Sequence, residues 1–313
     1  MNFPFYIARR YLFSKKKHNA INIISGISVC GVALATLALV CTLSVFNGFQ
    51  DMVASFFTAF DPQLKITVRE GKVFDAQDER IRAVCALPEV EVFTETLEEN
   101  AMVQYKDRQA MVVLKGVEDN FEELTAIDSI LYGAGEFVLH DSIVNYGVMG
   151  VELVATLGTG LEFVDPLQVY LPKRNAKVNM ANPGASFNRD YLYSPGVVFV
   201  VNQQEYDGKY ILTSLDFLRQ LLDYTTEVSA MELKLKSNVN TSSVQSKIEN
   251  ILGDDFVVQN RYQQQADVFR IMEIEKLISY LFLTFILMIA CFNVIGSLSM
   301  LILDKKDDVV TLR

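Results

Sequence analysis

The chain has 313 residues, half of them hydrophobic, and its formal net charge is −10. A chain this acidic is not a basic nucleic-acid binder, so no nucleic-acid partner is expected. Its four cysteines and two histidines form no cluster with metal-ligand spacing, and we expect no metal and no cofactor.

The first eighteen residues are strongly basic. Residues 1–18 hold five Lys and Arg and no acidic residue. The positive-inside rule places such a segment in the cytoplasm. Aromatic residues between the bases indicate a short helix lying in the membrane interface. A plain basic leader to the following span has the same pattern.

Asn19 to Gln50 predicts a first transmembrane helix. These 32 residues carry no charge, and a helix of that length rises to about 48 Å, whereas a bilayer core needs only about 20 residues. A cleavable signal peptide has an apolar region of only ~7–15 residues, so we predict an uncleaved anchor. Gly31, Ala35 and Ala38 form a strip where another helix can pack closely, or they reflect ordinary use of Gly and Ala in membrane helices.

Leu277 to Leu303 predicts a second transmembrane helix. These 27 residues are uncharged and make about 40 Å of helix. Residues 261–276 precede them as a polar stalk. Asn293, Gly296 and Ser297 lie within the run, and we expect them to face other helices rather than lipid.

The two spans divide the chain between the sides of the membrane. With residues 1–18 inside, residues 51–276 lie outside and residues 304–313 return to the inside. The charged ending at Arg313 has no helix cap or breaker, so we expect the protein to continue beyond it.

The outer segment has α/β patterning and holds 35 acidic and 20 basic residues. Its first β-α-β unit begins with the strand Leu64–Val68, which alternates apolar and polar residues. A helix capped by Asp75 follows, then the strand Glu89–Thr94 and a hairpin over Ala101–Val117.

A second β-α-β unit lies near the end of the outer segment. The strand Met231–Leu235 precedes a helix capped by Thr241 or Ser242, and the strand Phe256–Gln259 follows it. Two such units enclosing an insert predict a split, ferredoxin-like half with a second subdomain at about 120–228. Within the insert we expect strands at Glu136–Leu139, Leu167–Leu171 and Val197–Val201, and helices at Ser142–Leu157 and Leu215–Tyr224.

A long segment at 173–194 lies between two of these strands. It is rich in Asn, Pro, Gly and Ser, and a loop this long in a compact domain is usually functional or disordered. Lys173 to Asp190 hold four bases and one acid, so the segment can attract an anionic surface of a partner. A surface loop without a partner is the alternative.

The chain lacks the motifs of common catalytic sites. There is no G-x-x-x-x-G-K-[ST] and no H-E-x-x-H. His140, Asp141 and Ser142 contain the letters of a hydrolase triad, but consecutive residues do not converge on one point. We therefore predict that the chain is not an enzyme.

Two short motifs carry a resemblance to a known family. Gly31-Val32-Ala33-Leu34 forms the centre of the first span, and Ser44-Val45-Phe46-Asn47-Gly48-Phe49 forms its exit. Together with the preceding A-R-R-Y-L, this opening resembles that of the lipoprotein-releasing ABC transporter permeases LolC and LolE, in the superfamily that includes FtsX and MacB. All 313 residues fit the first part of that family's layout.

The resemblance implies a fold and a place in the cell. The fold would be membrane α-helical, with two spans here, plus an extracytoplasmic α/β (α+β) MacB-like periplasmic core domain with porter-like and inserted subdomains. The protein would be a multi-pass protein of the bacterial inner membrane with its large domain in the periplasm. The family continues through two more spans.

The resemblance also implies partners. A separate LolD-like ATPase subunit would use ATP, and a second permease subunit or a second copy would complete the transporter. Lipoproteins would be the substrates, and a LolA-like periplasmic carrier would receive them. The segment at 173–194 takes the place of the carrier-binding hook, with Lys173, Arg174, Lys177, Pro183, Phe187, Arg189 and Tyr191 as contacts. The chain end takes the place of the ATPase-coupling helix, with Lys305, Lys306, Asp308 and Arg313.

Two other functions stay open. The same fold occurs in MacB-like exporters and in FtsX-like regulators of cell-wall hydrolases. A two-span receptor, whose outer domain senses a ligand, is the third interpretation.

Overall fold

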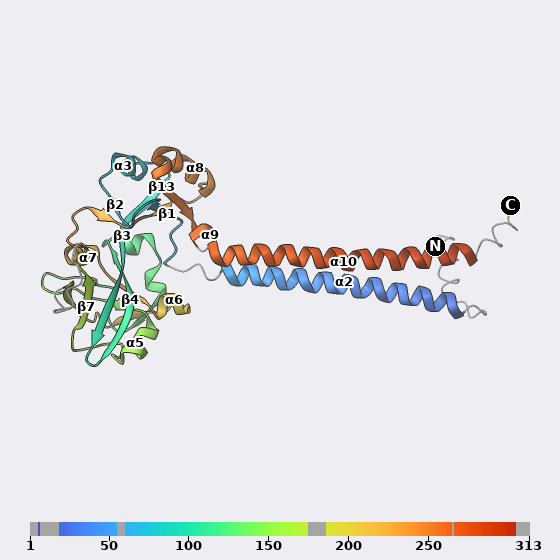
Figure 1. The fold of residues 1–313 in the computed structure, drawn as a ribbon, viewed down its shortest axis with the longest axis horizontal. Coiled ribbons are helices and arrows are strands. Elements are labelled where there is room, and N and C mark those ends of the chain that lie inside the picture. Colours follow the sequence, from blue (N-terminus) through green and yellow to red (C-terminus); the bar gives the residue numbers. More distant parts are fainter. Residues whose placement is uncertain (1–5, 7–18, 55–59, 175–185, 265, 305–313) are drawn as a thin grey trace. The chain divides into compact units, whose positions relative to one another are not determined.

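A computed structural model describes residues 6, 19–54, 60–174, 186–264 and 266–304. The chain divides into two compact units (Figure 1). One comprises Met1–Ala54 with Asp267–Arg313, and the other comprises Ser55–Ala266. We call them the helix pair and the α/β unit and describe each by itself. The basic segment 1–18, apart from Tyr6, and the predicted coupling residues lie outside the described residues; the latter are Lys305, Lys306, Asp308 and Arg313.

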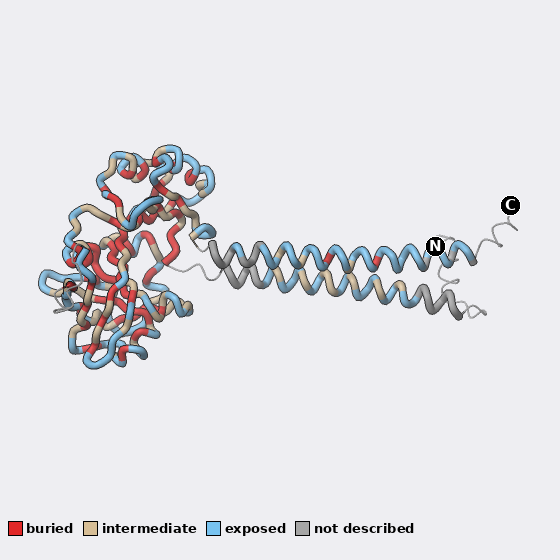
Figure 2. Tube along the Cα trace, viewed as in Figure 1, coloured by how far each residue is buried: buried red, intermediate tan, exposed pale blue. Residues whose placement is uncertain are grey.

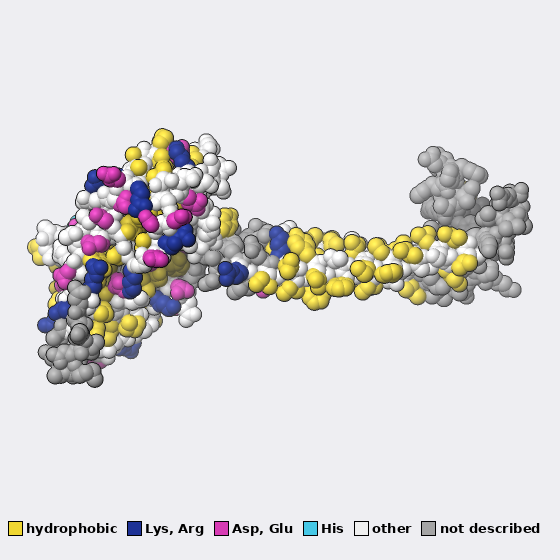
Figure 3. Space-filling view, turned by 45° about the horizontal axis from the view of Figure 1, so that its top comes forward, with side chains coloured by type: hydrophobic (Ala, Val, Ile, Leu, Met, Phe, Trp, Pro, Cys, Tyr) yellow, Lys and Arg dark blue, Asp and Glu magenta, His cyan; other side chains and the backbone are white. Residues whose placement is uncertain are grey.

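The helix pair consists of two long apolar helices, α2 (Asn19–Ala54) and α10 (Ala266–Asp304). Within them, Gly26–Gly48 and Ile274–Met300 are long and apolar enough to cross a membrane. Hydrophobic side chains cover the pair along its length (Figure 3). Both predicted spans are therefore confirmed as helices of sufficient length and composition.

The α/β unit is built on a mixed sheet that has nine strands in the described residues. Seven follow the order β13-β1-β12-β3-β4-β10-β6, and β7 and β8 extend the sheet from β3. The strands are β1 (Leu64–Val68), β3 (Val90–Tyr105), β4 (Arg108–Val117), β6 (Val148–Met149), β7 (Leu167–Pro172), β8 (Phe187–Leu192), β10 (Tyr210–Ser214), β12 (Ala230–Leu235) and β13 (Phe256–Asn260).

Short strands and helices complete the unit. Two small sheets pair β2 (Phe74–Asp75) with β11 (Glu227–Val228), and β5 (Leu131–Gly133) with β9 (Val197–Phe199). The helices are α3 (Glu79–Cys85), α4 (Phe121–Leu124), α5 (Val151–Leu157), α6 (Gln204–Asp207), α7 (Leu215–Leu222), α8 (Thr241–Leu252) and α9 (Arg261–Gln264), with 3-10 turns at Ile127–Ile130 and Gly253–Asp255.

The predicted ferredoxin-like half is confirmed. Strands β13, β1, β12 and β3 lie next to one another and are all antiparallel. Each β-α-β unit contributes one helix to a shared core, in which Ile81 and Val84 of α3 pack with Val244 and Ile248 of α8. The helices alternate polar and apolar faces because only one side of each is buried.

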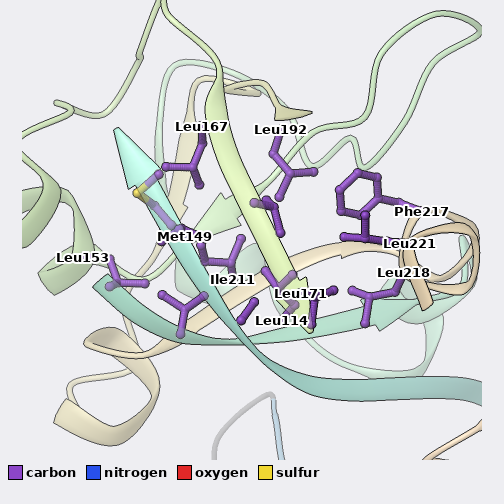
Figure 4. Packing of buried hydrophobic residues seen from close by; sticks show 14 of the residues in the cluster. Leu114, Met149, Leu153, Leu167, Leu171, Leu192, Ile211, Phe217, Leu218 and Leu221 are labelled. Atoms are coloured by element: carbon purple, nitrogen blue, oxygen red, sulfur yellow. The ribbon is translucent and has the colours of Figure 1, made fainter. Parts of the chain in front are cut away.

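The inserted half has its own core on the same continuous sheet. The long strand β3 runs through both halves and pairs with β4 and β7 in its second part. Leu114, Met149, Leu153, Ile211 and Leu218 meet between the strands and the helices α5 and α7 (Figure 4). Buried residues therefore fill the α/β unit, whereas the helix pair is mostly exposed (Figure 2).

Two predicted helix starts were wrong by a few residues. The helix α3 is capped by Asp78, whose side chain accepts from the backbone of Arg80, because Asp75 lies in β2. The helix α8 is capped by Asn240 rather than by Thr241 or Ser242. Asn and Asp cap helices as well as Ser and Thr do, so several neighbouring polar residues compete for the position.

Two predicted elements of the insert were also wrong. Residues 136–139 form no strand, and the helix predicted from Ser142 begins only at Val151. A Cβ at Gly150 would collide with the backbone of Asp207, so this glycine permits a close approach of two chain segments rather than a helical turn. Val148 and Met149 pair instead with β10.

Candidate functional site

The α2 strip of small residues lies at the contact between α2 and α10. The two helices run antiparallel, since Ser28 Oγ donates to the carbonyl of Asn293 at 3.2 Å near one end and Lys276 lies over the ring of Phe46 near the other. The less exposed side chains of each helix recur every three or four residues, as in a coiled-coil seam. We call them the helix seam: Ser28, Gly31, Ala35, Ala38, Leu39, Thr42 and Phe46 with Lys276, Ser279, Leu283, Ile286 and Ala290.

Gly31 lies close to Asn293 of α10. A Cβ at Gly31 would lie 3.5 Å from Asn293 Nδ2, whereas at Gly26 and Gly48 it would meet nothing within 4 Å. Gly31 therefore has room for a methyl group but for little more. Asn293 faces the first span, as the strip requires.

The other two residues predicted to pack against a helix, Gly296 and Ser297, are not among the residues that define the helix seam. A Cβ at Gly296 would also meet nothing within 4 Å, so this residue faces away from α2. The side chain of Ser297 lies outside the described residues. Any role of Gly296 in helix packing requires a further helix and stays a prediction.

One seam residue was missed by sequence reasoning. The ammonium group of Lys276 lies 5.5 Å from the ring centre of Phe46 and 6.0 Å from that of Tyr280. A cation over aromatic faces is stabilised by their quadrupoles. Its signal in the sequence was its place as the last charged residue before the second span.

The segment predicted as a carrier-contact loop is partly a β-hairpin. Strand β8 pairs antiparallel with β7 from Leu167 opposite Leu192 to Pro172 opposite Phe187. Phe187, Arg189 and Tyr191 therefore lie on a strand, which corrects the prediction of a loop through 194. The backbone N–H of Lys173 donates to Ser186 and extends the ladder.

The described hairpin residues present an exposed, basic and aromatic surface. Lys173, Arg174, Phe187, Arg189 and Tyr191 are all exposed. The guanidinium of Arg174 lies 5.2 Å from the ring centre of Tyr224. The other two predicted contacts, Lys177 and Pro183, lie outside the described residues.

The hairpin continues into an open face of the sheet. Met111, Met102, Tyr170 and Arg189 lie in one cross-strand row over β4, β3, β7 and β8. The next row on the same face is Gln109, Gln104, Gln168 and Tyr191. None of these eight side chains is buried and none is acidic. We call the two rows the open sheet face.

A group of four charged residues, two of them buried and two half-buried, lies further along the sheet. We call Lys65, Glu98, Lys115 and Glu232 the ion cluster. Lys115 Nζ lies 2.6 Å from Glu232 Oε1 and 3.7 Å from Glu98 Oε1, and Lys65 Nζ lies 3.2 Å from Glu98 Oε1. Lys115 is 2% exposed and Glu232 is 0% exposed, so this pair is fully removed from solvent.

Opposite charges in the ion cluster keep Lys65 and Glu98 ionised. Burial acts to raise the pKa of Glu98, but the positive charges of Lys65 and Lys115 outweigh it and lower that pKa to about 2. Burial acts to lower the pKa of Lys65, but Glu98 and Glu232 outweigh it and raise that pKa above its usual value. Lys65 and Glu98 therefore keep their charges at neutral pH.

Comparison with known proteins places the chain in a family. Residues 25–251 match the family described as the MacB-like periplasmic core domain, and the chain belongs to it. The lipoprotein-releasing system transmembrane protein LolE of Haemophilus influenzae is 23% identical over 321 residues, which cover 100% of this chain and 74% of LolE. LolC of Neisseria meningitidis is 25% identical over 317 residues, covering 98% of this chain and 72% of LolC.

Solved structures give a weaker likeness. The periplasmic region of MacB from Actinobacillus actinomycetemcomitans aligns with a TM-score of 0.44 at 10% identity, covering 66% of this chain and 91% of that one. The family match and the full-length similarity to LolC and LolE confirm the resemblance seen in the opening motifs.

Proposed function

We infer that this chain is a permease subunit of an ATP-driven ABC transporter that extracts lipoproteins from the bacterial inner membrane and passes them to a periplasmic carrier. The observation that carries the inference is the similarity to LolC and LolE along the whole chain, from the first span to the second. The helix pair and the α/β unit supply the two parts such a subunit needs, a membrane anchor and an extracytoplasmic domain.

The helix pair is the proposed membrane part. Its outer surface is apolar along Gly26–Gly48 and Ile274–Met300, which suits contact with acyl chains and with the spans of a second subunit or a second copy. A lipid-anchored substrate would enter from the bilayer beside this pair. ATP hydrolysis would take place on a separate ATPase subunit, which would act through the segment 304–313.

The hairpin of β7 and β8 is the proposed carrier contact. Lys173, Arg174 and Arg189 give it positive charge, although residues 51–276 carry 35 acids and 20 bases overall. An acidic rim on the carrier would be attracted to this surface and repelled elsewhere on the domain. Phe187 and Tyr191 would provide apolar contact area, as aromatic residues do at interfaces.

Photo-crosslinking tests the carrier contact. A photoreactive residue at Tyr191, which is 42% exposed, is expected to capture a lipoprotein carrier in intact cells. Phe93 is an equally exposed aromatic control at 39% on the ferredoxin-like half, and it should capture none. A cell-wall hydrolase captured from Tyr191 would contradict the proposal and favour the FtsX-like function.

Co-purification tests the transporter as a whole. The tagged chain, extracted from its native membrane, is expected to bring with it one ABC ATPase subunit and a permease partner. A chain that supports lipoprotein release in a strain deleted for that ATPase would contradict the ATP-driven mechanism.

A further inference from the structure

Phe60 covers the ion cluster. Its side chain is 4% exposed, and its ring centre lies 5.8 Å from Lys115 Nζ. The same ring lies 4.8 Å from the ring of Phe199 and 5.1 Å from that of Tyr206. Phe60 therefore packs among aromatic side chains of the inserted half. Its ring also lies over the charge of Lys115 on the central strand β4.

The residues next to Phe60 are tied to the far end of the α/β unit. The carboxylate of Asp61 accepts from the hydroxyl of Tyr206 at 3.2 Å. The carbonyl of Asp61 accepts from Arg261 Nε at 2.9 Å, and the carbonyl of Pro62 accepts from Gln264 Nε2 at 3.1 Å. We call Phe60, Asp61 and Pro62 the plug.

The plug covers charges that gain from hydration. Moving a charged side chain out of water costs several kcal/mol, which an ion pair only partly recovers. Glu232 Oε2 is buried and has no hydrogen-bond partner among the described residues, so this carboxylate is only half satisfied. A cavity of about 250 Å³, lined in part by Phe60, Lys65, Glu98 and Lys115, lies beside the cluster.

These features favour a plug that opens readily. Withdrawal of Phe60 loses apolar burial, but it lets water reach the ammonium group of Lys115, over which its ring lies. If the residues beneath the plug were apolar, exposing them to water on opening would give no favourable free energy of hydration. The ion cluster therefore lowers the cost of opening compared with an apolar core.

We propose that the plug and the ion cluster form a latch that releases the chain segment following α2. In the sequence the plug is separated from Ala54, the last residue of α2, by residues 55–59, and Gln264 precedes the first residue of α10 by two positions. With the latch closed, Asp61 and Pro62 accept hydrogen bonds from Arg261 and Gln264, and Phe60 packs over the ion cluster. With the latch open, residues 60–62 leave the ion cluster. Opening of the latch as proposed does not depend on which substrate the protein carries.

Hydrogen exchange measured by mass spectrometry tests the latch on the full chain with its native partners in lipid nanodiscs. In the double variant Lys115→Met/Glu232→Leu, apolar side chains replace the pair, so opening should become rarer and exchange over residues 60–66 about tenfold slower. Phe60→Ala should make exchange over the same residues at least tenfold faster, because the seated ring is lost.

A matched control and three outcomes decide the proposal. Lys247→Met removes an ion pair of nearly equal length, 2.7 Å to Glu89, whose Lys side chain is 46% exposed; it should leave residues 60–66 unchanged. Faster exchange in the double variant would overturn the latch, because the charges would then stabilise the closed state. Loss of the folded α/β unit in that variant would overturn it for the same reason. Unchanged exchange in Phe60→Ala would show that the ring does not control opening.

Discussion

The helix pair and the α/β unit hold themselves together by different means. The α/β unit buries three clusters of apolar residues and, beside them, the charged pair of Lys115 and Glu232. The helix pair buries few side chains and brings α2 and α10 together along a seam that includes Gly31, Ala35 and Ala38. In water, burial of apolar surface drives packing, whereas in an apolar surrounding it contributes little and close backbone approach matters more.

This difference predicts that the two units respond to substitutions in different ways. Removing Lys115 or Glu232 alone should strongly destabilise the α/β unit, because the partner charge stays buried and unpaired. Enlarging one small residue in the helix pair should leave folding intact and disturb helix packing. The following predictions test this contrast, from the largest expected effect to the smallest.

Loss of Lys115 alone should have the largest effect. Lys115→Met leaves the fully buried Glu232 without its partner, which should destabilise the α/β unit by about 3–5 kcal/mol. Urea denaturation of the full chain in detergent, followed by far-UV circular dichroism, measures it. The pair of Lys247, which is 46% exposed, and Glu89, which is 27% exposed, provides the control, and Lys247→Met should destabilise the α/β unit much less than Lys115→Met does. Equal losses in both variants would contradict the account of the ion cluster.

Acid should weaken the α/β unit through Glu98. Its pKa is lowered from 4.5 to about 2 in the folded state, so its stabilising contribution is complete above pH ~4.5 and is lost as the pH falls through 2. The loss should be on the order of 3 kcal/mol. The free energy of unfolding, measured between pH 5 and pH 2, checks it. Glu98→Gln should remove this part of the pH dependence, and an unchanged pH profile would contradict it.

Enlarging Gly31 should disturb the seam by a smaller amount. Gly31→Leu forces a side chain against Asn293, at a cost of about 1–3 kcal/mol to helix packing. We expect normal insertion and a normal α/β unit, but impaired release of lipoproteins. Gly26→Leu is the matched control, since nothing lies within 4 Å of its added Cβ. Normal lipoprotein release by a stable Gly31→Leu protein would contradict this role of the strip. Gly31, Ala35 and Ala38 would then be only the small residues that ordinarily occur in membrane helices.

Reversing the charge of the hairpin should have the smallest effect on folding and a specific effect on partner binding. Arg189→Glu lies on an exposed position of β8, so stability should change by less than about 0.5 kcal/mol. Binding of an acidic carrier should weaken about tenfold and lose part of its salt dependence. Surface plasmon resonance at two salt concentrations measures it. Arg69→Glu, also exposed but on the ferredoxin-like half, should leave binding unchanged.

Much of the fold could be predicted because its signals are local. The strands β1 and β12 alternate apolar and polar residues, and α7 follows the capping residue Ser214, whose side chain accepts from the backbone N–H of Phe217. The order of the four strands in the ferredoxin-like half then follows from two β-α-β units in sequence. The two uncharged runs are long enough to define α2 and α10 without further context.

Strand β8 could not be predicted because its support comes from distant residues. Its sequence, FNRDYL, has no apolar alternation. It pairs with β7 across a long connection, and Asn188 donates to the carbonyl of Leu221 at 2.7 Å. Local propensity does not detect such contacts.

The ion cluster was missed for a related reason. Lys65 in LKITV, and Glu232 in MELKL, occupy the polar positions of alternating strands, which normally face water. In the structure that side of the sheet is covered by Phe60, Phe121 and Tyr206, which come from segments far away in the sequence. Alternation identifies the two faces of a strand, but it does not show whether both are buried.

The central claim is that this chain works with an ATPase to release lipoproteins from the membrane. Proteoliposomes containing the chain, its native permease partner, the ATPase and a radiolabelled lipoprotein test it directly, with the periplasmic carrier added outside. The account predicts transfer of the lipoprotein to the carrier on addition of ATP, and none with ATP absent or with Gly31→Leu. Transfer at the same rate without ATP, or no transfer with all components present, would contradict it.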